Sequence, residues 1–339
     1  MKLATPEWWY RRGLDARHGG MPALWAALTP LSWIWARVTA RRIARAHPAY
    51  PGVPVICVGN VTVGGAGKTP VVRAVAERLA ARGRTVHLLS RGYGGRLAGP
   101  IRVDPERHVS ADVGDEPLML ARDFPVWVAR DRAAGARAAA AAGAEVLVMD
   151  DGHQNPSVKK ALTIVVVDGE TRGDEWPFGD GRVFPAGPMR EPLKAGLART
   201  DAVLVLLPAD LPAIDPELVE TLEGPPLLSA HLKAASPPPA GPQVGFAGVG
   251  KPWKVERALQ AAGCDLRDFA GFPDHAAYDE AVLQRLARRA EDFGAGLVTT
   301  EKDWVRLPPA WRERVTAWPV IAMFDDPAAL DALLAKACL

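Results

Sequence analysis

The sequence predicts an α/β protein whose mostly parallel sheet carries helices on both faces, as in P-loop NTPases. Short apolar, β-branched runs alternate with helical patterns along most of the chain. The run at residues 53–58 leads through a glycine-rich turn, GGAGKT, into a helical pattern. Another run, at 145–149, ends in the adjacent carboxylates Asp150 and Asp151. A strand that ends in Asp is the expected partner of a P-loop, because such an Asp helps to hold Mg²⁺.

Composition limits the classes of protein to consider. The chain has 339 residues, 48% of them hydrophobic and 24% charged, which is typical of a folded chain with one large or two ordinary domains. Its three cysteines form no CxxC pair, which argues against a disulfide framework or a structural zinc site. A net charge of +2 indicates no nucleic-acid partner, and no feature indicates a protein partner.

Residues 1–46 are predicted to be an amphipathic helical segment that lies in a membrane interface. The first 50 residues carry eight Lys or Arg and two Asp or Glu, a net charge of +6, and the remainder carries −4. Five of the eleven tryptophans lie within the first 35 residues. Pro30 interrupts the best apolar run, so a spanning helix is not expected. Trp and Arg enrichment favours interfacial contact, and a helix packed on the protein's own core is the alternative.

The stretch from residue 53 to 75 has the parts of a phosphate-binding loop. Glycines let backbone N–H groups converge on an anion, Lys68 reaches the outer phosphates and Thr69 can bind Mg²⁺. Thr62 stands where the usual motif has Gly, and Val63 stands where partitioning-type ATPases have an extra Lys, which disfavours that class. The residues predicted to bind nucleotide are Thr62, Val63, Gly64, Gly65, Ala66, Gly67, Lys68 and Thr69.

Two segments after the P-loop helix carry candidate site residues. A strand over 84–89 is expected to lead into a glycine-rich loop with Tyr93, at the sheet edge where α/β proteins bind ligands. Asp115 and Glu116 begin a short predicted helix. These carboxylates are either residues that favour the helix dipole or a base and a metal ligand, and the pattern alone leaves both interpretations open.

Loops follow the strand that ends at Asp151. His153 either contacts substrate or satisfies hydrogen bonds of its own loop. Arg182 and Arg190 lie in a Gly- and Pro-rich loop, where they either hold a phosphate or sugar or are simply solvated. A Pro-rich stretch at 208–242 is expected to be a connection with little regular structure. We therefore expect a P-loop domain over 47–222 and a smaller C-terminal α/β lobe over 223–339.

The smaller lobe has one candidate acid/base group. Strands are expected at 244–247, 297–300 and 320–323, and helices at 253–262, 278–293 and 327–337. His275 follows Asp274 in a loop before the longest helix. It is either a general acid or base with an orienting carboxylate, or an incidental residue beside a helix cap. The TTEKD segment at 299–303 does not indicate GTP specificity.

The ordered set of motifs resembles the tetraacyldisaccharide 4′-kinase family of lipid A biosynthesis. The segments are GNVTVGGAGKTP, SRGYGG, VGDEP, DDGHQ, VFPAGPMREP, FPDH and TTEKD, and the resemblance runs from the N-terminus to about residue 307. The family's own loop has the form TVGGAGKT, which accounts for Thr62. It has an aromatic residue and then His in the loop after Asp-Asp, where this chain has His153 and Asn155.

The resemblance implies transfer of the γ-phosphate of ATP to the 4′-hydroxyl of a tetraacylated glucosamine disaccharide 1-phosphate, giving lipid IV-A. It implies ATP and Mg²⁺ as cofactors and a peripheral, monotopic protein on the cytoplasmic face of the bacterial inner membrane. Asp115 is then the base, paired with His275. The Mg²⁺-side residues are Thr69, Glu116, Asp150 and Asp151, and the candidates for holding the disaccharide are Tyr93, Arg132, Arg182 and Arg190.

Two other functions fit parts of the sequence. One is a P-loop nucleotide switch that recruits partners to membranes, against which Val63 and the FPDH motif count. The other is a soluble P-loop kinase of a small metabolite, which would leave the Trp- and Arg-rich segment without a role.

Overall fold

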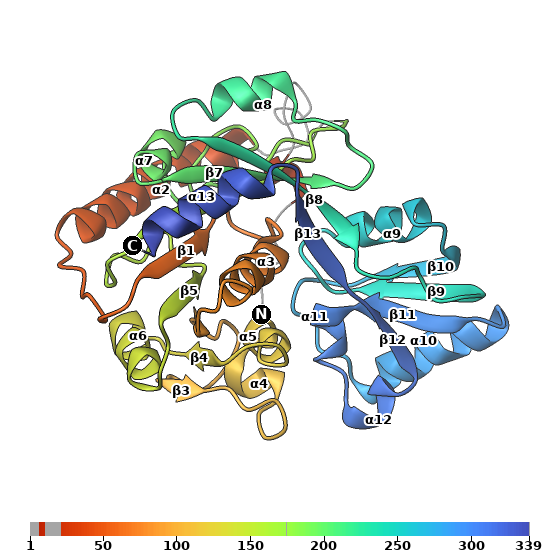
Figure 1. Ribbon diagram of the computed structural model, residues 1–339. Helices are drawn as coiled ribbons and strands as arrows, with labels where there is room; N and C mark the ends of the chain where they lie inside the picture. The colour runs from red at the N-terminus through yellow and green to blue at the C-terminus, as the bar shows by residue number, and fades with distance from the viewer. Residues whose placement is uncertain (1–6, 11–21, 174, 339) are drawn as a thin grey trace.

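The computed structural model describes residues 7–10, 22–173 and 175–338, and it contains a large and a small sheet side by side (Figure 1). The large sheet has nine strands in the order β13-β8-β7-β6-β1-β5-β2-β4-β3. All its pairs are parallel except β13 with β8 and β3 with β4. Its strands are β1 (Val55–Gly59), β2 (Val86–Ser90), β3 (Ile101–Arg102), β4 (Val126–Val128), β5 (Val146–Asp150), β6 (Leu162–Asp168), β7 (Ala202–Pro208), β8 (Leu227–Ala234) and β13 (Val320–Phe324).

Helices cover both faces of this sheet, as predicted. Successive residues of a strand point to opposite faces, so in β1 Ile56 and Val58 join one core cluster while Val55 and Cys57 join another. Residues of α3 (Lys68–Ala80) and α13 (Pro327–Ala337) belong to the first cluster, and residues of α6 (Arg132–Ala141) belong to the second, on the opposite face of the sheet. Beyond η1 (Glu7–Tyr10), the helices of this part are α3 (Lys68–Ala80), α4 (Ser110–Val113), α5 (Asp115–Leu120), α6 (Arg132–Ala141), α7 (Leu193–Leu197), α8 (Pro216–Thr221) and α13 (Pro327–Ala337).

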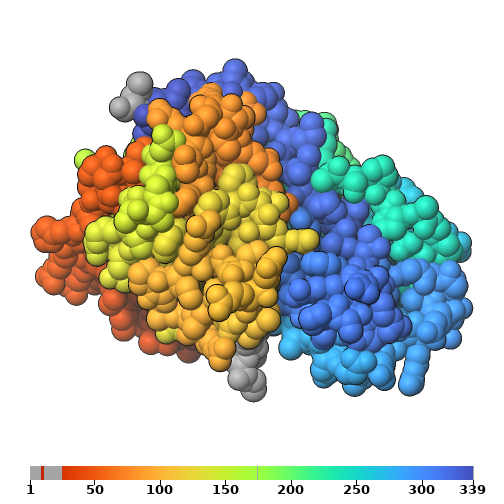
Figure 2. Space-filling model, turned by 60° about the horizontal axis from the view of Figure 1, so that its bottom comes forward, coloured from red at the N-terminus to blue at the C-terminus, as the bar shows by residue number. Residues whose placement is uncertain are grey.

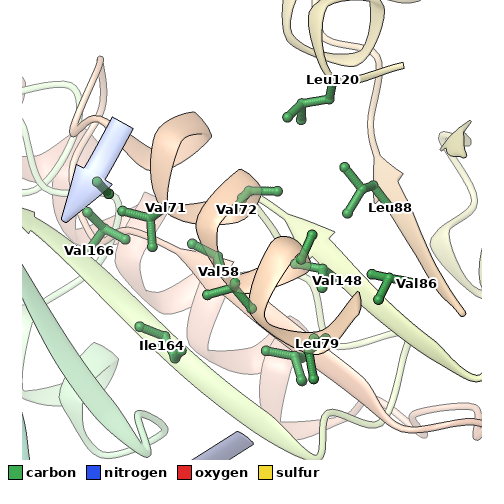
Figure 3. Close-up of a cluster of buried hydrophobic side chains, with 14 of the residues drawn as sticks. Val58, Val71, Val72, Leu79, Val86, Leu88, Leu120, Val148, Ile164 and Val166 are labelled. Atoms are coloured by element: carbon green, nitrogen blue, oxygen red, sulfur yellow. The ribbon is translucent and has the colours of Figure 1, made fainter. Parts of the chain in front are cut away.

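The core beneath α3 fixes the start of the P-loop helix relative to the sheet (Figure 3). Val71, Val72 and Leu79 of α3 are buried against Val58 of β1 and Val148 of β5. Burying such side chains contributes roughly 1.5–3 kcal/mol each. The helix therefore begins at a defined place, directly above the carboxyl ends of the two central strands.

The smaller lobe is a four-stranded, wholly parallel sheet in the order β10-β9-β11-β12. The part of the chain built on the nine-stranded sheet is the large lobe. Figure 2 shows its surface around residues 100–120 lying against the smaller lobe. The elements of the smaller lobe are β9 (Pro242–Ala247), α9 (Pro252–Ala261), β10 (Asp265–Gly271), α10 (Glu280–Asp292), β11 (Gly296–Thr300), α11 (Glu301–Trp304), α12 (Pro309–Arg312) and β12 (Val315–Trp318).

The N-terminal helix α2 (Pro22–Ala44) continues through Pro30, which interrupts the apolar run of the sequence but not the helix. Pro lacks the N–H that an inner helical residue donates, but the helix is nevertheless held on both sides of it. The Trp25 ring lies 4.8 Å from the guanidinium of Arg182, and Ser32 Oγ accepts from Ala186 N at 3.1 Å. None of the helices among the described residues combines the length and apolar character needed to cross a bilayer.

Two expectations about the middle of the chain were wrong. The stretch 208–242 is not irregular, because it contains α8 and the eight-residue strand β8. Apolar residues of β8 pair with β7, and this burial outweighs the Pro-rich composition on either side. The boundary expected at 222/223 also does not separate the two sheets, because β8 and β13 both belong to the large one. The smaller sheet is an insertion between them.

Candidate active site

The glycine-rich loop joins β1 to the first turn of α3. Gly67 adopts the left-handed conformation (φ 72°) at the start of the helix, and Gly64 has φ 96°. A side chain at either position would be strained, which explains why the loop needs glycine there. Lys68 and Thr69 therefore stand at the helix N-terminus, where backbone N–H groups and the helix dipole favour an anion.

The loop is held by the segment that contains Arg190. Val63 N donates to Pro188 O at 2.7 Å, and Arg190 N donates to Val61 O at 2.8 Å. These backbone bonds carry the Arg190 side chain to the end of β5, where it donates to Asp151 Oδ1 at 2.6 Å. The structure thus brings Arg190 to the P-loop rather than leaving it solvated.

Asp150 and Asp151 lie side by side in different electrostatic environments. Burial raises the pKa of Asp150 to about 7, and its Oδ1 has no hydrogen-bond partner among the described residues. Burial would also raise the pKa of Asp151, but the nearby charges of Lys68 and Arg190 hold it well below its usual range. Lys68 Nζ lies 3.6 Å from Asp151 Oδ1. One carboxylate is therefore paired, and its neighbour presents an unsatisfied oxygen.

A second cluster forms where the two lobes meet. Asp115 begins α5 in the large lobe, and its Oδ2 lies 2.7 Å from Nδ1 of His275 in the small lobe. Asp115 is 6% exposed. The two positions are 160 residues apart in the sequence, so this pair is a product of lobe docking. The charge of Glu116 also raises the pKa of Asp150, although less than burial and the adjacent Asp151 do, so the charges of this cluster and of the P-loop interact.

Small-lobe cations complete the second cluster. Lys302 Nζ lies 2.8 Å from Glu116 Oε1 and 3.3 Å from Asp274 Oδ1. Burial opposes the charge on Glu116, but Lys302 lowers the pKa of that carboxyl below its usual range. Arg306 Nε lies 3.4 Å from Asp115 Oδ2. The acidic pair of α5 is therefore matched by two cations from the other lobe.

Backbone conformation marks the same two clusters. Among the described residues other than glycine, a positive φ occurs at Asp151 (53°) and His275 (57°). Non-glycine residues in this region cost free energy, and such residues gather at functional sites. One of these positions belongs to each half of the candidate site.

The N-terminal η1 and the small lobe reach over the P-loop. Tyr10 donates its hydroxyl to Val63 O, and Lys251 Nζ lies 4.9 Å from the centre of the Tyr10 ring. Burial raises the pKa of Tyr10 to about 12. A side chain at Gly250 would place its Cβ 3.3 Å from Gly65 N. The loop is therefore approached from outside the large lobe.

The remaining predicted residues are dispersed. Tyr93 is 67% exposed, and its ring centre lies 5.4 Å from that of His275. Arg132 is only 3% exposed, and it donates to Ala129 O at 2.6 Å. Arg182 is paired with Asp180 at 2.6 Å and lies over Trp25 of α2. Among the predicted substrate residues, Tyr93 thus lies beside the Asp115–His275 pair, called the dyad below.

His153 is buried rather than presented to a substrate. It is 2% exposed, and burial lowers its pKa to about 3. A side chain at Gly59 would place its Cβ only 2.6 Å from His153 Cβ, so the residue is packed directly on β1. Neither ring nitrogen has a hydrogen-bond partner among the described residues, so the structure buries His153 without the loop hydrogen bonds that were its alternative role.

Four site residues were missed by the sequence interpretation: Tyr10, Lys251, Lys302 and Arg306. Lys302 lies in TTEKD, a segment that carried the family resemblance but received no role. Its acidic partner, Glu116, was already a candidate, and an unassigned cation in a shared motif was the available signal. Tyr10 and Arg306 lie outside every recognised motif, so no local pattern marked them.

Comparisons with known proteins agree on one family. The family described as Tetraacyldisaccharide-1-P 4′-kinase matches residues 24–339. A protein named tetraacyldisaccharide 4′-kinase from Phenylobacterium zucineum is 72% identical over 334 residues, covering 98% of this chain and 99% of its own length. Its namesake from Caulobacter vibrioides is 69% identical over 335 residues, covering 98% of each chain. An LpxK crystal structure from Aquifex aeolicus in complex with ATP superposes with a TM-score of 0.72 at 25% identity, covering 93% of this chain and all of that one.

Proposed function

Because the chain belongs to the tetraacyldisaccharide-1-P 4′-kinase family, we propose that its two residue clusters are the donor and acceptor halves of one kinase site. The reaction is ATP-dependent phosphorylation of the 4′-position of a tetraacyldisaccharide 1-phosphate, in lipid A biosynthesis. The single observation that carries the assignment of residues is the 2.7 Å contact between Asp115 and His275 across the two lobes.

In the acceptor half, Asp115 acts as the base toward the 4′-hydroxyl. Its Oδ2 is held by His275 Nδ1. A buried carboxylate fixed at one oxygen can accept a proton through the other, and general-base help of this kind contributes roughly 10²–10⁴-fold. Tyr93, exposed beside His275, is placed to contact the sugar.

In the donor half, Lys68 and the backbone N–H groups at the start of α3 bind the phosphates of ATP. Phosphoryl transfer depends on positioning and charge stabilisation, which these groups provide. Arg190 keeps Asp151 ionised and oriented through its 2.6 Å contact. Because that carboxylate is also paired with Lys68, the phosphate-binding amine is held close to β5.

The donor half has the residues to hold Mg²⁺. Asp150 presents a buried oxygen without a partner among the described residues, and Thr69 provides a hydroxyl in the first turn of α3. Oxygen donors of these kinds suit Mg²⁺. When bound, the ion neutralises charge on the phosphates. Asp151 and Glu116 are occupied by Arg190 and Lys302, so we assign them a supporting role.

The test of this function is a phosphate-transfer assay with labelled ATP and the tetraacyldisaccharide 1-phosphate. Asp115→Asn is expected to lower kcat by roughly 10²–10⁴-fold and to leave the Kd for ATP within about twofold, because the carboxylate does not belong to the donor half. Near-native transfer by this variant would show that Asp115 is not the base.

We further infer that α2 contacts the membrane that holds the acylated substrate. Several of its large apolar side chains lie on the surface instead of in a core, and they include Trp33 (70% exposed), Ile34 (60%) and Val38 (58%). Arg37 and Arg41 follow on the same helix. Apolar and aromatic residues next to arginines are typical of helices in an anionic membrane interface. We propose that this membrane is the bacterial inner membrane and that the helix contacts its cytoplasmic face.

Deleting the helix is a poor test, because α2 also supports the active-site loop through Trp35 Nε1, which donates to Arg190 O at 3.0 Å. The double variant Trp33→Ser, Ile34→Ser changes only exposed side chains. It is expected to lower binding to anionic phospholipid vesicles at least about tenfold, with kcat on detergent-dispersed substrate unchanged. Phe293→Ser, at an exposed position of the small lobe, is the matched control. Unchanged vesicle binding by the double variant would refute this membrane contact.

A further inference from the structure

We propose that Arg306 is a positioning residue for Asp115 and that buried Asp303 fixes its guanidinium. The inference rests on the proposed role of Asp115 as the base. It adds a positioning residue to the acceptor half. This residue comes from a segment of the small lobe that lies outside both the P-loop and the FPDH motif.

Arg306 contacts Asp115 directly and His275 through the backbone on either side of it. Its side chain is 6% exposed, and its Nε lies 3.4 Å from Asp115 Oδ2. One terminal nitrogen donates to Gly248 O at 2.9 Å and the other to Ala276 O at 3.0 Å. Gly248 O also accepts from the backbone N of His275 at 3.2 Å. A single planar guanidinium therefore holds the carboxylate and both sides of the His275 loop.

Asp303 has the contacts of an anchor for this guanidinium. It is 0% exposed, and its Oδ1 accepts from Arg306 at 2.7 Å, from Gly248 N at 2.9 Å and from the Tyr278 hydroxyl at 2.6 Å. A buried carboxylate is stable only when it is paired and hydrogen-bonded, so it constrains each of these donors. The donors in turn have little freedom to leave it.

The contacts select one oxygen of the base. Both His275 Nδ1 and Arg306 Nε approach Oδ2 of Asp115. With Oδ2 held from two directions, the carboxylate cannot rotate freely, and Oδ1 becomes the oxygen that faces the acceptor hydroxyl. Orientation of this kind matters for catalysis, since a misplacement of about 1 Å can cost on the order of 10²-fold in rate.

A purely structural role for Arg306 predicts different kinetics from a positioning role. A structural arginine would stabilise the small lobe, and its loss would lower the amount of folded enzyme or affect every kinetic constant. A positioning residue affects kcat and leaves the KM for ATP unchanged, because it acts on the acceptor half alone.

The experiment compares Arg306→Gln, Arg306→Lys and Arg312→Gln in the phosphate-transfer assay. Gln retains hydrogen-bond donors for the loop carbonyls but lacks the charge that faces Asp115. Lys retains the charge. Arg312 is the matched control, because it also donates to backbone carbonyls of the small lobe, at 2.8 Å to Val305 O and 3.0 Å to Leu307 O, and it contacts neither member of the dyad.

We expect Arg306→Gln to lower kcat about 10–100-fold with the KM for ATP within about twofold, and Arg306→Lys to recover at least about fivefold of that loss. Arg312→Gln is expected to keep wild-type kcat per folded molecule. Wild-type kcat in Arg306→Gln, no recovery by Lys, or an equal loss in Arg312→Gln would each overturn the inference.

The Asp115→Asn background separates this inference from the function on which it rests. Adding Arg306→Gln to Asp115→Asn is expected to cost less than about twofold more, because the oriented group is already gone. If Asp115→Asn loses activity while Arg306→Gln does not, only the inference fails. If Asp115→Asn is itself active, the proposed base is wrong and Arg306 has no catalytic carboxylate to orient.

Discussion

The donor and acceptor halves of the site are built in different ways. In the donor half, Lys68 begins the helix that follows β1 and Asp151 directly follows β5, so the pairing of these two adjacent strands brings them together. In the acceptor half, Asp115 and His275 come from different lobes and meet through lobe docking. The first half needs only the large lobe to fold, whereas the second also needs the small lobe in place. Substitutions can therefore impair one half of the site and leave the other half intact.

The largest expected effect is in the donor half. Lys68→Ala removes the cation next to the phosphate-binding loop and leaves Asp151 with Arg190 alone. We expect kcat/KM for ATP to fall by roughly 10³-fold or more, since charge stabilisation dominates phosphoryl transfer. Unlike Asp115→Asn, this variant is also expected to bind ATP measurably more weakly in calorimetry. Wild-type ATP affinity with wild-type turnover would remove Lys68 from the donor half.

The next effect concerns the contact between the lobes. Asp168, at the end of β6, accepts from Lys254 at 2.6 Å and Lys251 at 3.1 Å, both from the small lobe. Burial opposes its charge, but these lysines lower its pKa well below the usual range. Asp168→Asn leaves Lys254 without its paired carboxylate and Lys251 with Glu175 alone, and we expect a loss of about 2–4 kcal/mol in the free energy of unfolding.

Urea denaturation measures this change. Asp265→Asn, which breaks an exposed pair with Arg267 in the same lobe, is the control and is expected to lie within about 0.5 kcal/mol of wild type. In Asp168→Asn we also expect kcat to fall more than the affinity for ATP. An equal change in the two variants would mean that this ion pair does not hold the lobes together.

The sequence accounts for these two halves unequally. The donor half was predictable, because GGAGKT and the Asp-Asp strand end are local patterns whose spacing follows from strand–loop–helix geometry. Asp115 and His275 were candidates, but a helix-dipole role for Asp115 and an incidental position for His275 fitted the sequence equally well. Only the family resemblance paired them. Lys302 and Arg306 could not be recognised as their partners, because a contact between lobes leaves no local periodicity.

The same reasoning explains where the fold departs from local propensity. The helix α2 continues through Pro30 because tertiary contacts on both sides of it compensate for the missing hydrogen bond. The strand β8 exists because β7 and β13 cover its two edges, although its neighbourhood is rich in Pro. Both cases show long-range packing overriding a local signal, which is the limit of any argument from propensity.

The smallest expected effect is a change in pH dependence at His153, next to the donor half. Its pKa of about 3, lowered by burial, means that the folded state binds a proton there less readily than the unfolded state. Stability should therefore fall as pH drops from about 6.5 toward 3, since the unfolded chain gains the proton first.

His153→Phe removes this group, and residue 153 lines an open pocket of about 280 Å³. We expect the free energy of unfolding of the wild type to fall by about 1–2 kcal/mol more than that of the variant between pH 7.5 and pH 5. Urea titrations at the two pH values measure the difference. Parallel pH dependence in the two proteins would show that His153 is not held neutral by burial.

The most direct test of the central claim is a double-mutant cycle on kcat with Asp115→Asn and His275→Gln. The claim is that two residues from different lobes act as one unit on the acceptor hydroxyl. It predicts that the double variant transfers phosphate within about threefold of the slower single variant, because the second change removes nothing further. Multiplicative losses, with the double variant slower by the product of both effects, would contradict the account and separate His275 from Asp115.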